Sequence, residues 1–124
     1  MIAGVGTDLC SIARIRRAAG SETFRKSVYT AGELEYCASR GVGEAASLAA
    51  IFAAKEAFVK ALGTGFGPLR PGDIEIGHEK SGAPAYFPGE KAAALMKEKG
   101  ISRVWLSLSH EGDLAMAVAV AEKE

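Results

Sequence analysis

The longest apolar stretch of the chain predicts a helix from Ala45 to Leu62. At about 100° per residue, its large apolar side chains fall within one arc, and most of the remaining circumference is alanine. The arc contains Leu48, Ile51, Phe52, Val59 and Leu62. Glycines at positions 63 and 65 end the helix. A helix that is apolar or small nearly all round is packed on most sides, so we expect it at the centre of the fold.

Shorter patterns precede this helix. Residues 2–7 are apolar and small, which predicts a short buried strand followed by a turn at Asp8. Ser11 is a candidate N-cap for a helix that runs to about Ala19. Thr30 and Glu33 have the spacing of a capping box, so we expect a second helix over about residues 31–39.

Alternation of apolar and polar residues dominates the second half and predicts strands. The segments "GDIEIGH" and "AYF", joined by the turn "KSGAP", form one expected hairpin. Pro88 suits the first turn of a helix that runs to about Lys99. The segments "SRVWLSLSH" and "DLAMAVAVA" flank the turn "EGD" and predict a terminal hairpin. The expected class is therefore α+β, a largely antiparallel sheet packed with the long central helix and shorter helices.

Composition narrows the function classes. A chain of 124 residues is expected to form one domain over positions 1–124. Lys and Arg number 15, as do Asp and Glu, so the basic footprint of a nucleic-acid binder is missing. No apolar run approaches the ~18 residues of a membrane span, and the N-terminus has no basic leader, so we expect a cytoplasmic protein. Cys10 and Cys37 lack metal-binding spacing and are expected to be reduced, mostly buried thiols.

Charged residues inside the long helix require an explanation. Lys55 lies within the apolar arc, and Glu56 and Lys60 are i,i+4 neighbours at its edge. In a structural interpretation, the Glu56–Lys60 pair stabilises the helix by about 0.3–0.5 kcal/mol, and Lys55 extends its ammonium group to solvent. In a functional interpretation, the charges line a cleft or an interface, because unpaired burial would be costly. The residues alone leave both interpretations open.

Asp8 and His110 are further candidates. Gly4 and Gly6 allow close approach of the backbone. A carboxylate at Asp8, where a strand leads into a helix, would be held in a fixed position suited to a functional site. An N-cap or turn aspartate explains Asp8 equally. His110 lies at a strand end, where it could reach a ligand or be an ordinary turn histidine. His78 has no partner at metal spacing and is expected to be a surface strand residue. No nucleotide-binding fingerprint or nucleophile motif is present.

These signals occur in a characteristic order along the chain. "GVGTDL" stands at the start, "FAAKEAFVKALGTG" in the middle and "LSLSHEGDLAMAVAVA" near the end. Together, over essentially the full length, they resemble the holo-acyl-carrier-protein synthases, the short homotrimeric 4′-phosphopantetheinyl transferases. The resemblance implies transfer of 4′-phosphopantetheine from coenzyme A to a serine of an apo acyl carrier protein, with release of 3′,5′-adenosine bisphosphate. The carrier could belong to fatty-acid or polyketide synthesis.

The resemblance also implies a role for each matching residue. Asp8 and Glu56 would bind Mg²⁺, Glu56 could help to deprotonate the serine hydroxyl, and Lys60 would neutralise or protonate the leaving phosphate. The positions expected to bind coenzyme A are Lys60, Gly63, Thr64, Gly65, Pro84, Ser109 and His110. Arg14, with Arg17 and Arg25, would contact the acidic helix of the carrier protein. The resemblance assigns no role to Lys55.

One position departs from the family pattern. Many members have an arginine immediately before the motif phenylalanine, where this chain has Ile51. Either Arg40, Lys80 or a neighbouring subunit supplies the missing phosphate contact, or coenzyme A binds more weakly. A catalytically inactive relative that binds coenzyme A or the carrier without turnover is the alternative function, and an unrelated oligomeric structural module is a third.

Overall fold

A computed structural model describes residues 1–124. The strands are β1 (Ile2–Ser11), β2 (Ile74–His78), β3 (Pro84–Pro88), β4 (Ile101–Glu111) and β5 (Leu114–Lys123). The α-helices are α1 (Ile12–Ala18), α2 (Glu22–Val28), α3 (Ala31–Ala38), α4 (Glu44–Leu62) and α5 (Glu90–Glu98). The 3₁₀ turns η1 (Gly41–Gly43) and η2 (Pro71–Asp73) precede α4 and β2 respectively.

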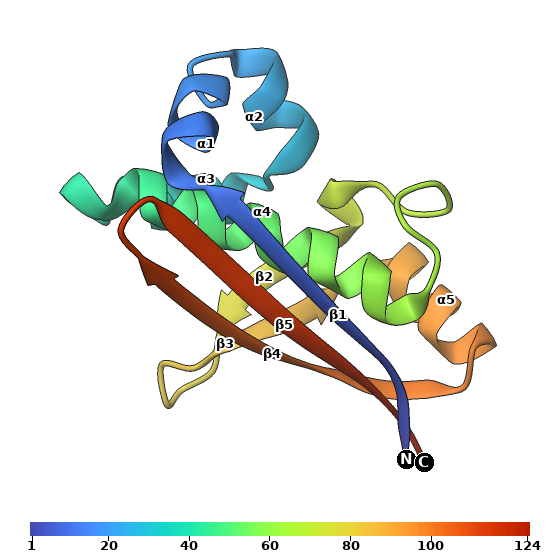
Figure 1. Cartoon of the computed structure of the whole chain (residues 1–124). Helices are drawn as coiled ribbons and strands as arrows, with labels where there is room; N and C mark the ends of the chain where they lie inside the picture. Colours follow the sequence, from blue (N-terminus) through green and yellow to red (C-terminus); the bar gives the residue numbers. More distant parts are fainter.

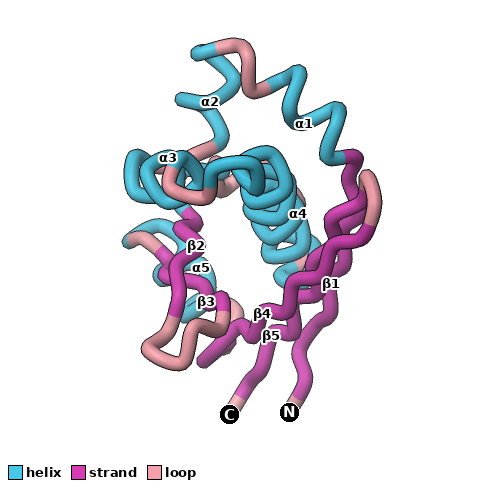
Figure 2. The backbone as a smooth tube through the Cα atoms, turned by 90° about the vertical axis from the view of Figure 1, so that its left-hand side faces the viewer, coloured by secondary structure: helices cyan, strands magenta, loops and turns pink.

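The strands form two antiparallel sheets with α4 between them. β5 is the central strand of the larger sheet and pairs with both β1 and β4, while β2 and β3 form a separate hairpin. Figure 2 shows α4 between the three-stranded sheet and the hairpin. Helices α1 and α2 lie above α4, at the end of the molecule away from the chain termini (Figure 1). The predicted α+β class, with an antiparallel sheet packed on a long central helix, is confirmed.

Small residues bring α4 close to the larger sheet. The side chains of β5 that face α4 are alanines without exposed surface, Ala115, Ala117, Ala119 and Ala121. A Cβ atom added to Gly6 would lie 2.1 Å from the carbonyl oxygen of Ala57, and one added to Gly4 would lie 2.0 Å from that of Ala61. The close backbone approach predicted for these glycines is therefore present. It places Asp8, further along β1, beside the second half of α4.

Local signals located three of the helix ends correctly. The Ser11 hydroxyl accepts a hydrogen bond from the Arg14 amide at the start of α1. Thr30 and Glu33 form the predicted capping box at the start of α3. Gly63, with a φ of 78°, ends α4 in the left-handed conformation that glycine adopts readily.

Two local predictions were wrong, and one helix was not predicted. β1 does not end at Thr7 but continues to Ser11, because it pairs with β5 along this length, so Asp8 is neither an N-cap nor a turn residue. Pro88 is the last residue of β3, and α5 begins only at Glu90. Helix α2 was not predicted, since it buries only Val28 and shows no long apolar periodicity.

The thiols agree with the sequence-based expectation. Cys10 and Cys37 are free, and Cys37 is fully buried, which raises the pKa of its thiol to about 12. Cys10 is half-buried, and burial raises the pKa of its thiol to about 11. Neither thiol is therefore primed as a nucleophile at neutral pH. Separately, none of the helices combines the length and hydropathy required to cross a bilayer.

Candidate functional site

Asp8 and Lys60 meet where β1 crosses α4. The Nζ atom of Lys60 lies 3.3 Å from Oδ1 of Asp8 and donates a hydrogen bond of 2.9 Å to the carbonyl oxygen of Thr7. The Asp8 side chain is 16% exposed and the Lys60 side chain 51% exposed, so a ligand can reach the pair from solvent. Lys60 forms its ion pair with Asp8 and none with Glu56, so the interpretation of Glu56 and Lys60 as a helix-stabilising pair is wrong.

Glu56 is the second carboxylate of this site. Burial raises its pKa above the ordinary glutamate value, the charge of Asp8 raises it further, and Lys60 opposes the shift. Asp8 and Glu56 both line a cavity of about 550 Å³. Two acidic groups thus face one space, where the charge of Asp8 makes Glu56 harder to ionise.

The pair of carboxylates fits a hard divalent cation. Mg²⁺ is typically held by one or two carboxylates, and substrate phosphates and waters complete its octahedron. No group of three or more His, Cys, Asp or Glu side chains that could hold a metal ion is assembled in the structure. Asp8 and Glu56 are therefore suitable ligands for Mg²⁺, but they supply only part of its six-ligand set. A cation between them would also relieve the repulsion that raises the Glu56 pKa.

One wall of the same cavity is basic. Helix α1 contributes Arg14 and Arg17 to it, two residues expected to contact the carrier protein. Arg25, the third residue expected to contact the carrier protein, lines a different cavity. Its guanidinium donates a hydrogen bond to the carbonyl oxygen of Ala19. The fold thus brings Asp8, Glu56, Arg14 and Arg17 to one cavity and leaves Arg25 outside it.

The residues expected to bind coenzyme A fall into two groups. Gly63, Thr64 and Gly65 follow α4 directly, one turn after Lys60. Pro84 lies at the start of β3, and Ser109 and His110 lie near the end of β4. His110 lines two cavities, and neither of them includes Asp8 or Glu56. Within one chain, His110 therefore lies outside the cavity that Asp8 and Glu56 line.

One of the His110 cavities has a volume of about 360 Å³ and contains Ile51, the position that departs from the family pattern. Ile51 is 4% exposed, so it contributes only an apolar wall. Arg40 lines the same cavity, whereas Lys80 is not among its lining residues. His78 is an exposed residue of β2, as expected, and its ring packs on that of Tyr36 with centroids 4.5 Å apart at this cavity.

Lys55 is the residue of α4 whose surroundings the sequence predicted least well. Its side chain is 1% exposed, so the interpretation that it extends to solvent is wrong. The Nζ atom forms an ion pair of 2.7 Å with Glu33, whose side chain has no exposed surface. Glu33 was expected only to cap α3. The capping-box signature accounted for this carboxylate fully, so nothing in the sequence pointed to a second partner 22 positions away.

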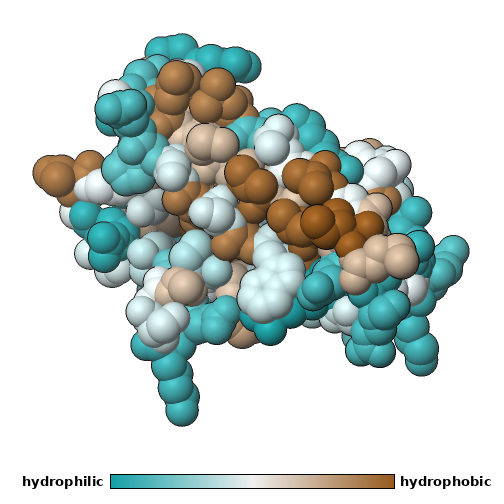
Figure 3. Space-filling model, turned by 60° about the horizontal axis from the view of Figure 1, so that its bottom comes forward, coloured by the Kyte–Doolittle hydropathy of each residue, from teal (hydrophilic) through white to brown (hydrophobic).

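The outer face of the three-stranded sheet is apolar. Figure 3 shows hydrophobic side chains gathered across this side of the molecule. The exposed large apolar residues of the three strands are Ile2, Val5, Leu9, Trp105, Leu114 and Met116. Val5 and Trp105 flank Val120 in register, so these side chains are neighbours on one face. Thr7 and Ser107 pair with Val118 on the same face, so small polar side chains lie between the apolar ones. Exposed apolar side chains gathered on one face are typical of protein interaction surfaces.

Comparison with known proteins identifies relatives over the whole chain. Residues 4–119 match the 4′-phosphopantetheinyl transferase superfamily. A holo-[acyl-carrier-protein] synthase of Neisseria gonorrhoeae is 44% identical over 126 aligned positions, which cover 99% of this chain and all of that protein. The crystal structure of the Neisseria meningitidis synthase superposes with a TM-score of 0.92 at 43% identity, covering 99% of this chain and 100% of that one. The Helicobacter pylori synthase in complex with coenzyme A is 30% identical, with a TM-score of 0.82 and coverage of 95% and 99%.

Proposed function

The chain belongs to the holo-[acyl-carrier-protein] synthases of the 4′-phosphopantetheinyl transferase superfamily, and we propose in detail how its residues carry out that transfer. The reaction moves 4′-phosphopantetheine from coenzyme A to a serine of an apo acyl carrier protein. The serine oxygen forms a bond to the β-phosphorus of the coenzyme A diphosphate, and the bond from that phosphorus to the bridging oxygen breaks. The leaving group is 3′,5′-adenosine bisphosphate. The observation that carries the proposal is the convergence of Asp8, Glu56 and Lys60 beside a cavity with a basic wall.

Asp8 and Glu56 are the proposed ligands of Mg²⁺. The raised pKa of Glu56 supports this assignment, because it reflects a partly buried carboxylate close to a second one. When bound there, Mg²⁺ would neutralise charge on the diphosphate of coenzyme A. Positioning and charge neutralisation are most of what phosphoryl transfer requires from a protein, so no protein nucleophile is needed.

Lys60 and Glu56 are the proposed proton-handling residues. The Lys60 ammonium, half-exposed at the end of α4, can turn from Asp8 towards an incoming phosphate and neutralise or protonate the leaving group. Glu56 accepts the proton of the carrier serine, directly or through a water. Its place in the cavity that Arg14 and Arg17 also line supports this role, because a carrier protein bound there would bring its serine close to Glu56.

Arg14 and Arg17 are the proposed contacts of the carrier protein. Both line the cavity that contains the two carboxylates, so an acidic helix bound to α1 would present its serine close to Glu56. Charges at the edge of an interface mainly accelerate association and select the partner. Arg25 is the weakest of the three candidates, because its guanidinium is engaged with the carbonyl oxygen of Ala19.

We also propose that the active form is a homotrimer with its sites between subunits. Two observations support this: the apolar outer face of the larger sheet, and the separation of His110 from the carboxylate cavity within one chain. In such an assembly, Pro84, Ser109 and His110 of one subunit complete the coenzyme A site at Asp8 and Glu56 of the next. Arg40, close to Ile51, is the proposed substitute for the arginine that other members carry.

Intact-mass measurement of an apo carrier protein tests the proposed function. The carrier is incubated with coenzyme A, Mg²⁺ and this protein, using carriers of fatty-acid and polyketide synthesis in parallel. We expect a phosphopantetheine adduct that disappears with a chelator, and no adduct with Asp8→Ala or Glu56→Ala, although both variants remain folded. No adduct with either carrier, together with retained coenzyme A binding, would instead identify an inactive relative.

A further inference from the structure

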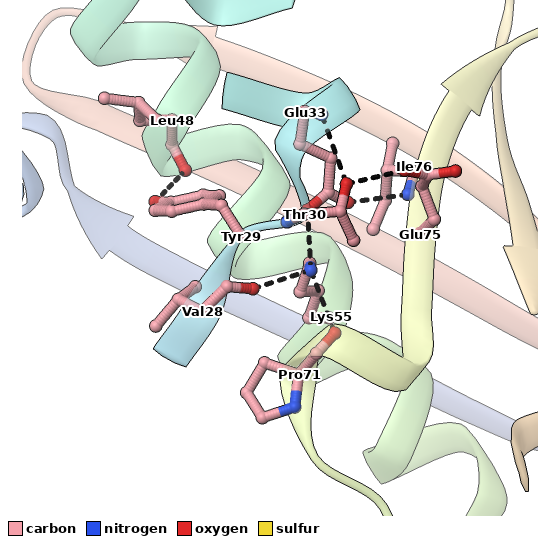
Figure 4. A network of polar contacts seen from close by, with 9 residues as sticks. All are labelled: Val28, Tyr29, Thr30, Glu33, Leu48, Lys55, Pro71, Glu75 and Ile76. Carbon is pink, nitrogen blue, oxygen red and sulfur yellow. Dashed lines mark hydrogen bonds and ion pairs between the residues drawn. The ribbon is translucent and has the colours of Figure 1, made fainter. Parts of the chain in front are cut away.

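Lys55 joins two separate chain segments to α4. Its Nζ atom donates hydrogen bonds of 2.7 Å to the carbonyl oxygen of Val28 and 2.9 Å to that of Pro71, and it forms the ion pair with Glu33 (Figure 4). An ammonium group has three N–H donors, so each of them has a partner. Val28 ends α2 and Pro71 begins η2. The side chain therefore fixes the backbone of both segments relative to the helix.

Glu33 completes this arrangement from the opposite side. One carboxylate oxygen accepts hydrogen bonds from the Thr30 amide and from Lys55, and the other accepts one from the Ile76 amide at 2.8 Å. Thr30 in turn donates its hydroxyl to Glu75 at 2.6 Å. No buried polar side-chain atom of the chain is left without a partner. Glu33 thus connects the start of α3 to β2 through a carboxylate that has no exposed surface.

Stability alone is a weak explanation for this pair. Removing two charges from water costs several kcal/mol per ion, and apolar side chains of the same volume often serve a core equally well or better. What an apolar pair cannot do is hold two backbone carbonyls in fixed positions. The specific contribution of Lys55 is therefore the geometry of the segments that it binds.

Those two segments adjoin the two proposed substrate sites. Val28 ends α2, and Phe24 of that helix lines the same cavity as Arg14 and Arg17 of α1, the proposed carrier contacts. Pro71 ends the loop that begins at Gly63, where coenzyme A is proposed to bind. Lys55 immediately precedes Glu56 on α4. One side chain therefore links both substrate-binding segments to the helix that carries the reactive groups.

We propose that Lys55, together with Glu33, is a positioning residue that holds the carrier-binding segment and the coenzyme A loop in register with Glu56 and Lys60. The inference rests on the proposed function for its kinetic consequence but not for its structural one. Lys55 itself touches no substrate. Misplacement of reacting groups by about 1 Å can cost up to about a hundredfold in rate, so the loss of this link should affect catalysis in molecules that are still folded.

The test uses two variants and a control on the same helix. Lys55→Met keeps the side-chain length but leaves the Glu33 charge buried, and this variant can fail to fold. The double variant Lys55→Met with Glu33→Gln removes both charges and avoids that problem. Tyr86→Phe is the control, because the Tyr86 hydroxyl donates a buried hydrogen bond to the carbonyl oxygen of Ala54, next to Lys55, whereas the carbonyl oxygens of Val28 and Pro71 are bound by Lys55.

Hydrogen exchange provides a readout that does not depend on turnover. At a temperature where all proteins are folded by circular dichroism, we expect peptides covering residues 25–30 and 70–76 to exchange faster in the double variant. Tyr86→Phe should leave both peptides unchanged. Equal protection of these peptides in the double variant and the wild type would overturn the proposal, whether or not the wild type transfers phosphopantetheine.

Kinetics of the folded proteins provide the second readout. Per folded molecule, we expect kcat/KM of the double variant to fall by about tenfold or more for both coenzyme A and the carrier protein. A purely structural role would lower the melting temperature and leave these constants close to those of Tyr86→Phe, which would refute the positioning role. A wild type without turnover would refute the proposed function instead, and hydrogen exchange would still decide whether Lys55 holds the two segments.

Discussion

At the scale of single residues, the electrostatics of Asp8 and Glu56 determine how the site depends on pH. Folding places Glu56 in partly buried surroundings near Asp8, and both effects disfavour its charged form. When the pKa of a carboxyl group is higher in the folded than in the unfolded state, the group stabilises the folded state. This contribution has its full value at pH values below the unfolded pKa. That contribution is lost as the pH rises through the folded pKa. At neutral pH, the ionised Glu56 therefore costs the metal-free protein stability.

We accordingly expect Glu56→Gln to stabilise the metal-free protein at pH 7. The gain should shrink towards pH 4, where Glu56 of the wild type is increasingly protonated and no longer repels Asp8. Urea unfolding at both pH values, in the presence of a chelator, measures the difference. Adding Mg²⁺ should stabilise the wild type more than the variant. A variant that is less stable than the wild type at pH 7 would contradict the origin given for the pKa shift.

Arg40 provides a second test at this scale. It is the arginine that lines the cavity of Ile51 and His110, and hydrogen bonds to charged groups contribute about 1.5–3 kcal/mol. Arg40→Gln should therefore raise the KM for coenzyme A by about tenfold or more, with little change in kcat. Lys80→Gln is the matched control, because Lys80 is not among the residues that line this cavity. Should Lys80→Gln raise the KM and Arg40→Gln leave it unchanged, the missing charge comes from the β2–β3 turn instead.

At the scale of elements, the contact between β1 and α4 sets the geometry of the site. Asp8 and Lys60 meet only because Gly4 and Gly6 let the strand approach the helix backbone. The alanines of β5 extend the same close packing to the central strand. A larger residue at these positions would move the strand away from the helix and separate Asp8 from Lys60.

Gly6→Ala should consequently destabilise the protein by about 2–3 kcal/mol, the usual upper range for overpacking. The new Cβ atom would lie 2.1 Å from the Ala57 carbonyl oxygen, which belongs to the backbone and cannot rotate away. Gly67→Ala is the control, since its Cβ atom would meet nothing within 4 Å and its φ is not positive. Chemical denaturation measures both variants. Equal stability of Gly6→Ala and the wild type would show that the helix can shift without cost.

At the scale of the whole molecule, the apolar outer face of the larger sheet is the proposed interface between subunits. A buried charge without a partner disfavours an interface strongly. Val5→Glu, in the middle of this face, should therefore shift the protein from trimer towards monomer in sedimentation velocity, and turnover should fall with it because the site is shared. Val42→Glu is the matched control: Val42 is also an exposed valine, but it lies in η1, outside the sheet. A trimer that survives Val5→Glu would place the subunit interface elsewhere.

The sequence by itself determined the features that depend on neighbouring residues. The helix caps at Ser11, Thr30 and Gly63, the central helix and the terminal hairpin all follow from local hydrogen bonding and periodicity. The family followed from three motifs in order along the chain. Helix α2 could not be predicted in the same way, because its sequence carries little apolar periodicity and its position depends on contacts with α4 and η2.

Only the tertiary structure decided which partner each charged side chain has. Spacing suggested that Lys60 pairs with Glu56, yet it pairs with Asp8, because a strand 52 positions away in sequence crosses α4 at that turn. Lys55 appeared able to reach solvent, yet it is buried against Glu33, because α3 and η2 cover that side of the helix. Ion pairing depends on distance in space and on loss of water. Both are set by the packing of elements that the sequence specifies separately but does not place relative to one another.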